Sequence, residues 1–275
     1  MNYHHIFHAG NRCDVVKHAV LTLVLSYLCN KNNGFAVIDT HAGEGLYDLE
    51  DPRAQKTSEA NEGIKALLSA PPIPTLEAYY AVLHKVNPVT QLRVYPGSPL
   101  IAYHMLRPQD RLMACELHPD DARALTRNAP KDQRFQVHER DGYEALPAFL
   151  PPPEKRGVVL IDPPYERPDE FEHLVQQFEK AYRRWPTGIY MIWYPVKDRP
   201  AIWKFHEALV KTGILKILCA EFIYDAEVRA DRLSGSGLIL VNAPWKLDEA
   251  LKELFPALHE AMKTEHSESV VKELS

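Results

Sequence analysis

The residues best suited to chemistry in this sequence are four in a row, Asp162-Pro163-Pro164-Tyr165. They follow an apolar, β-branched run, Gly157 to Ile161, which predicts a buried strand that ends at the acid. The two prolines fix the backbone and supply no N–H, so they end the strand and hold carbonyl acceptors in a preset geometry. A carboxylate, carbonyls and an aromatic ring grouped in this way suit the binding of a flat base through its exocyclic amino group. A proline-rich turn at a strand end is the structural alternative.

This tetrapeptide resembles the catalytic motif of S-adenosylmethionine-dependent amino-group methyltransferases. An exocyclic amine is a poor nucleophile because its lone pair is delocalised into the ring, so catalysis should come from positioning and local electrostatics. We expect the carboxylate of Asp162 and the carbonyl of Pro163 to accept the two N–H bonds, while Tyr165 stacks on the base. Asp162 would then accept the proton that the methylated nitrogen releases. Such a base must be unpaired or flipped out of a helix.

Composition places few limits on the partners of this chain. A net charge of −5 over 275 residues gives no global positive field for nucleic acid, although Lys155-Arg156 and Arg183-Arg184 are local basic pairs. The four cysteines are scattered and form no Cys-x-x-Cys pair, so neither a zinc site nor a disulfide framework is indicated. The N-terminus does not read as a signal peptide, and the longest apolar run is too short for a membrane span. We therefore expect a cytoplasmic enzyme.

Strands and helices alternate along most of the chain, which predicts a parallel sheet covered on both faces. The expected strands are 35–39, 111–117, 134–138, 157–161 and 188–194, and the expected helices are 13–30, 119–128, 142–149, 169–184 and 199–212. The last strand-like runs, 214–223 and 237–242, have no helix between them and predict an antiparallel hairpin. This α/β order resembles the Rossmann-like sheet of class I methyltransferases.

One connection is too long for a single crossover. About seventy residues separate the first strand from the second, and residues 57–69 and 75–86 read as two helices within them. Ser98, as an N-cap followed by Pro99, predicts a further helix at 99–106. We interpret 47–96 as a small inserted helical subdomain and 1–46 with 97–275 as the main domain. The tail beyond Lys263 is expected to fray.

Polar residues after the first two strands could hold a cofactor, because ligands of open α/β sheets lie at the carboxyl ends of the strands. Residues 39–45 read Asp-x-His-x-Gly-x-Gly, with His41 in the loop, and keep the spacing of the cofactor loop of class I methyltransferases. The three-glycine dinucleotide pattern is absent. Glu116 could accept hydrogen bonds from both ribose hydroxyls or could be a solvated residue at a strand end.

Two further positions allow a structural and a functional interpretation. Asp141, with Gly142, either caps the next helix or accepts a hydrogen bond from the adenine amine of a cofactor. Ser98 either caps its helix or faces the carboxylate of the cofactor from a helix N-terminus. The order of these residues along the chain, all after strands or at a helix start and together with Asp162, favours the functional interpretation.

The N-terminus carries an unusual group of rings: Tyr3, His4, His5 and His8, followed by His18. No i, i+4 histidine pair joins a carboxylate as it does in metal-binding helices, so no metal site is expected. These side chains could instead stack on nucleotides or hydrogen-bond to them.

A set of motifs at consistent spacing resembles the RlmJ family, whose members methylate N6 of a specific adenine in 23S ribosomal RNA. The motifs are Phe7-His8-Ala9-Gly10-Asn11, Asp14-Val15, Lys17-His18, Asp39-Thr40-His41-Ala42-Gly43, Tyr95-Pro96-Gly97-Ser98-Pro99-Leu100, Glu116-Leu117-His118-Pro119, Asp162-Pro163-Pro164-Tyr165, Trp193-Tyr194-Pro195 and Pro244-Trp245-Lys246. The resemblance implies Asp162 as the catalytic residue and Tyr3 as a contact to substrate RNA. It implies S-adenosylmethionine contacts from His18, His41, Ser98, Glu116, Asp141, Gly142 and Asp162.

The expected partner is therefore 23S ribosomal RNA, free of ribosomal proteins or in an early particle, with a monomeric enzyme and neither metal nor membrane. A DNA adenine-N6 methyltransferase would need the same tetrapeptide. Methylation of protein glutamine would call for Asn at position 162. A non-catalytic nucleic-acid-binding or DNA-utilisation protein on the same scaffold is the alternative from another class.

Overall fold

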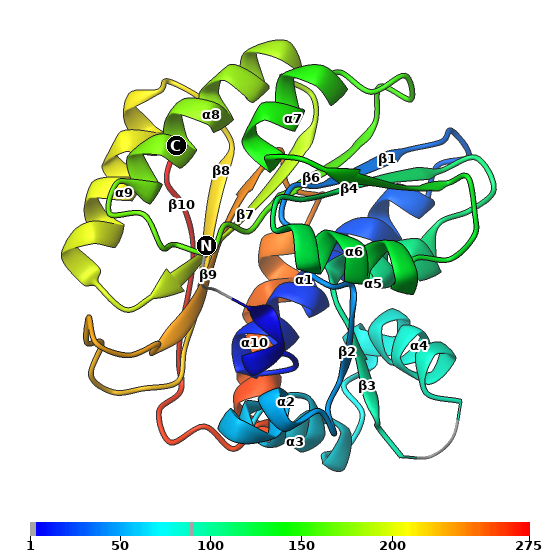
Figure 1. The fold of residues 1–275 in the computed structure, drawn as a ribbon. Coiled ribbons are helices and arrows are strands. Elements are labelled where there is room, and N and C mark those ends of the chain that lie inside the picture. Colours follow the sequence, from blue (N-terminus) through cyan, green and yellow to red (C-terminus); the bar gives the residue numbers. More distant parts are fainter. Residues whose placement is uncertain (1–3, 89–90) are drawn as a thin grey trace.

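One large sheet with helices on both faces forms the centre of the molecule (Figure 1). The structure, a computed structural model, describes residues 4–88 and 91–275. Its strands run in the order β10-β8-β9-β7-β6-β1-β4-β5. Their bounds are β1 (Ala36–Asp39), β4 (Arg111–Glu116), β5 (Phe135–Glu139), β6 (Gly157–Ile161), β7 (Ile189–Val196), β8 (Ile217–Ile223), β9 (Gly235–Val241) and β10 (Glu268–Glu273).

The parallel strands β5, β4, β1, β6 and β7 bring their carboxyl ends to one edge. Asp39 at the end of β1 is in register with Ala114 of β4 and Leu160 of β6, so the residues that follow these three strands meet. β9 pairs antiparallel with both β7 and β8. The predicted parallel sheet with a terminal antiparallel hairpin is confirmed.

The sheet is buried on both faces because alternate strand residues enter two separate apolar clusters. Val37 and Leu160 pack on one side, whereas Ile38 and Ile161 pack on the other. The first side is covered by α1 (Arg12–Cys29), α5 (Ser98–Met105), α6 (Pro119–Asn128) and α10 (Leu247–Ala261), and the second by α7 (Gly142–Phe149), α8 (Glu170–Arg184) and α9 (Arg199–Lys211).

The long connection between β1 and β4 forms a group of short elements in the lower part of Figure 1. Its elements are β2 (Leu46–Asp48), α2 (Pro52–Thr57), η2 (Glu59–Asn61), α3 (Ile64–Ser69), η3 (Pro74–Leu76), α4 (Glu77–Val86) and β3 (Val94–Pro96). β2 and β3 pair as a small antiparallel sheet, so the connection is not purely helical. The predicted continuous helix at 57–69 is wrong. Ser58 adopts a left-handed conformation, and Gly63 approaches the carbonyl of Gly10 so closely that a Cβ would lie 2.2 Å from it.

The C-terminal segment is ordered, and the prediction that it frays is wrong. β10 adds an antiparallel strand to β8, with Val270 opposite Glu221 and Val271 opposite Ala220. Helix α10 precedes β10 in the chain, and its apolar face packs on the sheet through Leu251 and Leu258. Strand pairing with residues about fifty positions earlier stabilises this segment, which short-range pattern does not reveal. All four cysteines are free thiols, and the helices of the described residues are too short or too polar to cross a bilayer.

Candidate active site

A cavity of about 510 Å³ opens at the carboxyl edge of the parallel strands. Its wall is built by loops after β1, β4, β5 and β6, together with the first turns of α1 and α5. It is lined by all the predicted site residues within the described part of the chain: His18, His41, Ser98, Glu116, Asp141, Gly142, Asp162, Pro163 and Tyr165. Tyr3 lies outside the described residues. Their roles remain predictions, but their proximity is a finding.

The loop after β1 is held close to the sheet by hydrogen bonds. The Thr40 hydroxyl donates to the carbonyl of Leu160 at 2.9 Å and lies 2.8 Å from Nδ1 of His41. Gly43 has a positive φ of 61°, and a Cβ there would lie 2.2 Å from the Tyr47 hydroxyl, so only glycine fits. Desolvation lowers the pKa of His41 to about 4, which leaves a neutral imidazole on the cavity wall at pH 7.

The buried carboxylate of Glu116 connects two of these loops. Its oxygens accept hydrogen bonds from the backbone N–H groups of Gly43 and His118, each at 2.8 Å. Burial raises the pKa of Glu116. Each oxygen keeps a second lone pair, and the side chain lines the cavity, so it has the acceptors that a ribose diol requires.

The helix starts around the cavity test the capping interpretations of Asp141 and Ser98. Asp141 does cap α7, because its carboxylate accepts from the N–H of Tyr143 at 2.7 Å and of Glu144 at 3.3 Å. It also lines the cavity, so the two interpretations are compatible. The prediction that Ser98 is an N-cap is wrong: Gly97 holds that position, and Ser98 is the first helical residue. Its hydroxyl is therefore not used for capping.

Gly142 is required by packing. A Cβ at this position would lie 2.0 Å from the carbonyl oxygen of Thr40, so α7 can begin this close to the β1 loop only without a side chain. The glycine thereby sets the distance between two walls of the cavity.

Asp39, to which the sequence pattern gave no role of its own, lies next to the cavity-lining residue Ser98. Its side chain is buried beside Ser98 at the end of β1. Burial, with repulsion from Asp162, raises the pKa of Asp39 to about 7. A strongly raised carboxyl pKa beside a cavity-lining residue is a feature that functional sites often have.

A buried ion network on α1 was also missed. The ammonium of Lys17 lies 2.5 Å from Oδ2 of Asp162 and 3.0 Å from Oδ1 of Asp14. Asp14 in turn accepts from the N–H of Gly10 at 3.0 Å and lies 2.8 Å from Nε2 of His5. Burial alone would lower the pKa of Lys17, but its two carboxylates outweigh burial and raise it. Likewise, burial would raise the pKa of Asp14, but the charges of His5 and Lys17 hold it well below its ordinary value.

His18 presents an unused polar atom to the cavity. Its Nδ1 lies 2.6 Å from the Tyr95 hydroxyl, whereas Nε2 is buried without a hydrogen-bond partner among the described residues. Burial lowers the pKa of His18 to about 3, so the ring is neutral. Because buried polar atoms are nearly always paired, this orphaned nitrogen indicates that a polar ligand belongs here.

Aromatic rings form the far wall, next to the Asp162 motif. Tyr165 has a positive φ of 52°, an unusual conformation for a bulky residue and one that is found at functional sites. Its hydroxyl donates to the backbone carbonyl of Trp193 at 2.6 Å, and the two rings are 5.8 Å apart. Trp193 itself lines the cavity. The rings could hold a flat base between apolar surfaces.

Charged side chains of both signs line the cavity beyond the Asp162 motif. Basic Arg167, Lys197 and Arg232 stand there with acidic Glu166 and Asp231. The inserted segment is tied to the N-terminal segment through Glu59, which lies 3.0 Å from Nδ1 of His8 and accepts from the Asn11 side chain at 2.9 Å.

A parallel sheet that ends in antiparallel strands, a glycine-containing loop after β1 and an acid at the end of β4 are the features of the class I methyltransferase fold. The chain is similar to a probable spermidine synthase from Corynebacterium glutamicum, with a TM-score of 0.50, 12% identity and coverage of 93% of this chain and 74% of that one. That similarity concerns the fold alone.

Much stronger similarities define the family. The family described as "Ribosomal RNA large subunit methyltransferase D, RlmJ" matches residues 32–273. "Ribosomal RNA large subunit methyltransferase J" of Escherichia coli K12 is 43% identical over 94% of this chain and 93% of its own length. The protein of the same name from Haemophilus influenzae is 41% identical over 96% and 95%. A crystal structure from Legionella pneumophila superposes with a TM-score of 0.89 at 34% identity, covering 97% and 98%. The chain therefore belongs to the RlmJ family of ribosomal RNA large subunit methyltransferases.

Proposed function

We propose that this protein transfers the methyl group of S-adenosylmethionine to N6 of a specific adenine in 23S ribosomal RNA. The observation that carries the proposal is the single cavity that joins the Asp162 motif to the β1 loop, Glu116 and Asp141. Family membership supplies the class of acceptor.

The residues on the sheet side of the cavity fit the cofactor. S-adenosylmethionine supplies an electrophilic methyl group on its sulfonium. Glu116 would accept hydrogen bonds from the ribose hydroxyls, and Asp141 from the adenine amine, while Ser98 would bind the carboxylate. The unpartnered Nε2 of His18 supports a polar ligand at this place. We assign cofactor contacts to His18, His41, Ser98, Glu116, Asp141, Gly142 and Asp162.

Asp162 and Pro163 would act on the acceptor base. The carboxylate and the Pro163 carbonyl would accept the two N6–H bonds and draw the lone pair out of conjugation. Lys17 engages Oδ2 of Asp162, so Oδ1 is the oxygen proposed to take the N–H and later the released proton. Tyr165 and Trp193 would hold the base by stacking.

Lys17 is a positioning residue in this mechanism. Its side chain is anchored by buried Asp14, and it fixes the rotamer of Asp162 through a charge-assisted hydrogen bond. The acidic catalytic group is thereby held in place before either substrate binds.

The RNA would approach past Arg167, Lys197 and Arg232 and over the N-terminal segment. The target base must leave its stack to enter the cavity, which favours RNA that is free of ribosomal proteins or in an early particle. We propose phosphate contacts from Arg167, Lys197 and Arg232 and an RNA contact from Tyr3. We also propose that residues 47–96 are an inserted subdomain that helps grip the RNA, and that the enzyme acts as a cytoplasmic monomer.

The proposal is tested by offering the purified protein radiolabelled S-adenosylmethionine with two acceptors side by side. Protein-free 23S RNA from a strain that lacks the modification should be labelled, and nuclease digestion should release the label as N6-methyladenosine. Preferential labelling of duplex DNA would instead favour a DNA methyltransferase. If calorimetry detected no binding of S-adenosylmethionine, a non-catalytic nucleic-acid-binding role would replace the proposal.

A further inference from the structure

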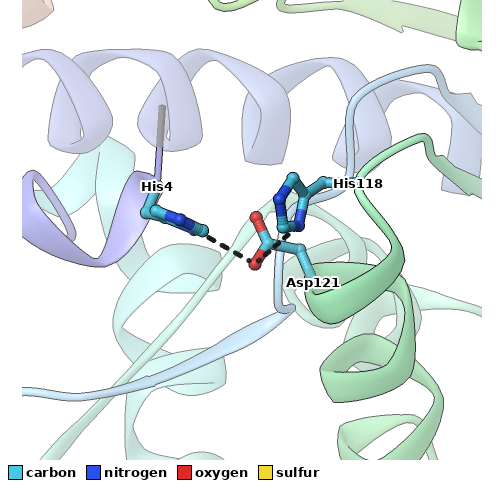
Figure 2. A group of neighbouring side chains, drawn as sticks. All are labelled: His4, His118 and Asp121. Carbon is cyan, nitrogen blue, oxygen red and sulfur yellow. Dashed lines mark ion pairs between the residues drawn. The ribbon is translucent and has the colours of Figure 1, made fainter. Parts of the chain in front are cut away.

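Three potential metal ligands meet at the edge of the cavity, outside the proposed chemistry. Figure 2 shows His4 from the N-terminal segment, His118 from the loop after β4 and Asp121 from the first turn of α6. The two parts of the chain are more than a hundred residues apart in sequence. All three ligand atoms, two imidazole nitrogens and a carboxylate oxygen, lie within 4.8 Å of one another.

The distances are close to those of a bound metal ion. Nδ1 of His4 lies 3.4 Å from Oδ1 of Asp121, and Nδ1 of His118 lies 3.8 Å from the same oxygen. In a tetrahedral zinc site with bonds of about 2.0–2.1 Å, neighbouring ligand atoms are roughly 3.4 Å apart. One pair already has that separation, and the other would close by about 0.4 Å on binding, which side-chain rotation can supply.

Within residues 4–88 and 91–275, the two nitrogens contact no polar group other than Asp121. Nδ1 of His4 and Nδ1 of His118 are both buried, and neither has a hydrogen-bond partner among the described residues. Asp121 is itself 8% exposed. Two orphaned buried nitrogens that point at one carboxylate require a further group, because unpaired buried polar atoms are costly.

We propose that His4, His118 and Asp121 bind one divalent cation of the zinc type. Nitrogen and carboxylate ligands suit Zn²⁺, and three protein ligands leave a fourth position for water. The ion would hold the N-terminal segment against the start of α6. Its ligand His118 lies two residues after Glu116, which is on the cofactor side of the cavity. The sequence predicted no metal here because the N-terminal histidines have no ligand partner within a helical turn. The partners come instead from residues 118 and 121.

A second group, His206 with Cys219 and Glu221, also brings ligand atoms together but is already satisfied. Glu221 pairs with Arg199 at 2.6 Å and accepts from Tyr194, and His206 lies 3.0 Å from the same tyrosine hydroxyl. It serves as the internal comparison.

The test uses the full chain without a purification tag, treated with a chelator and then titrated with Zn²⁺ alone in a calorimeter. The wild type should bind one ion, with an increase in melting temperature. His4→Gln and Asp121→Asn should each weaken this binding by about tenfold or more. His8→Gln and His206→Gln should bind Zn²⁺ as the wild type does, because those histidines lie outside the group.

Co²⁺ provides a second readout that does not depend on stability. The wild type should develop the visible absorption of Co²⁺ with nitrogen and oxygen ligands, and His4→Gln should not. The proposal is overturned if the wild type binds no stoichiometric Zn²⁺, or if His4→Gln and Asp121→Asn bind it unchanged. In that case the three side chains form an ion-pair cluster without metal.

Discussion

Replacement of Lys17 by methionine tests the buried ion network most severely. The side chain of Lys17 is 5% exposed and that of Asp14 is 2% exposed, so water can scarcely replace the lost ammonium. The variant leaves the carboxylates of Asp14 and Asp162 without the cation between them. Loss of one partner from a buried pair costs about 3–5 kcal/mol. We expect the free energy of unfolding to fall by that amount.

The assay is urea denaturation at pH 7.5, followed by circular dichroism and tryptophan fluorescence. A matched control is Lys211→Met. The side chain of Lys211 is 76% exposed, and its ammonium lies 3.8 Å from the carboxylate of Glu207. It should cost less than about 1 kcal/mol.

A double variant distinguishes the effect of the lost charge pairing from the effect of altered side-chain packing. Asp14→Asn combined with Lys17→Met removes the charges of Asp14 and Lys17 and leaves that of Asp162, so we expect it to be more stable than Lys17→Met alone, with a coupling energy of about 1–3 kcal/mol. The reasoning is refuted if Lys17→Met loses less than about 1 kcal/mol, or if the two substitutions are simply additive.

Three further predictions follow from single positions. Because burial raises the pKa of Asp39 to about 7, its folded form holds a proton that the unfolded chain releases near pH 4, and the stability from this proton is lost as the pH rises toward 7. Between pH 5 and pH 8, the free energy of unfolding of Asp39→Asn should therefore rise by about 2 kcal/mol relative to that of the wild type, as measured by urea denaturation. A difference between the two proteins that does not change with pH would contradict this. Gly142→Ala places a Cβ 2.0 Å from the Thr40 carbonyl oxygen. It should lower the free energy of unfolding by about 1–3 kcal/mol and weaken the binding of S-adenosylmethionine measured by calorimetry. Unchanged affinity would count against the role of Gly142 in setting the cavity width. Tyr165→Phe removes the hydrogen bond to the Trp193 carbonyl, so the free energy of unfolding should fall by about 1 kcal/mol. The variant should also have a lower kcat/KM for RNA and an unchanged affinity for the cofactor. A change in cofactor affinity alone would contradict the stacking role.

Local sequence pattern predicted the sheet and most of its helices because their signals are short-range. The apolar run 157–161 is a strand with those bounds, and helices 119–128 and 142–149 begin and end where caps and apolar spacing indicate. Segments that depend on distant partners were not predictable in this way. β10 exists through its pairing with β8, and the break near Gly63 follows from contact with Gly10.

The candidate site shows the same division. Polar residues directly after strands were predicted to meet, because parallel strands end at one edge, and the structure places them around one cavity. The Lys17 network was missed, although a lysine within an otherwise apolar helix is itself a signal that a buried partner exists. The group of His4, His118 and Asp121 had no such signal, because its members belong to unrelated motifs.

The most direct test of the account is a comparison of Asp162→Asn with the wild type and with Asp248→Asn, a surface control on α10. Calorimetry with S-adenosylmethionine and methyl transfer to unmodified 23S RNA are measured on the same preparations. The account predicts that Asp162→Asn binds S-adenosylmethionine within about tenfold of the wild type but loses about 10²–10⁴-fold in methyl transfer, while Asp248→Asn changes neither. Near-normal methyl transfer by Asp162→Asn would contradict the central claim that this carboxylate acts on the adenine amine.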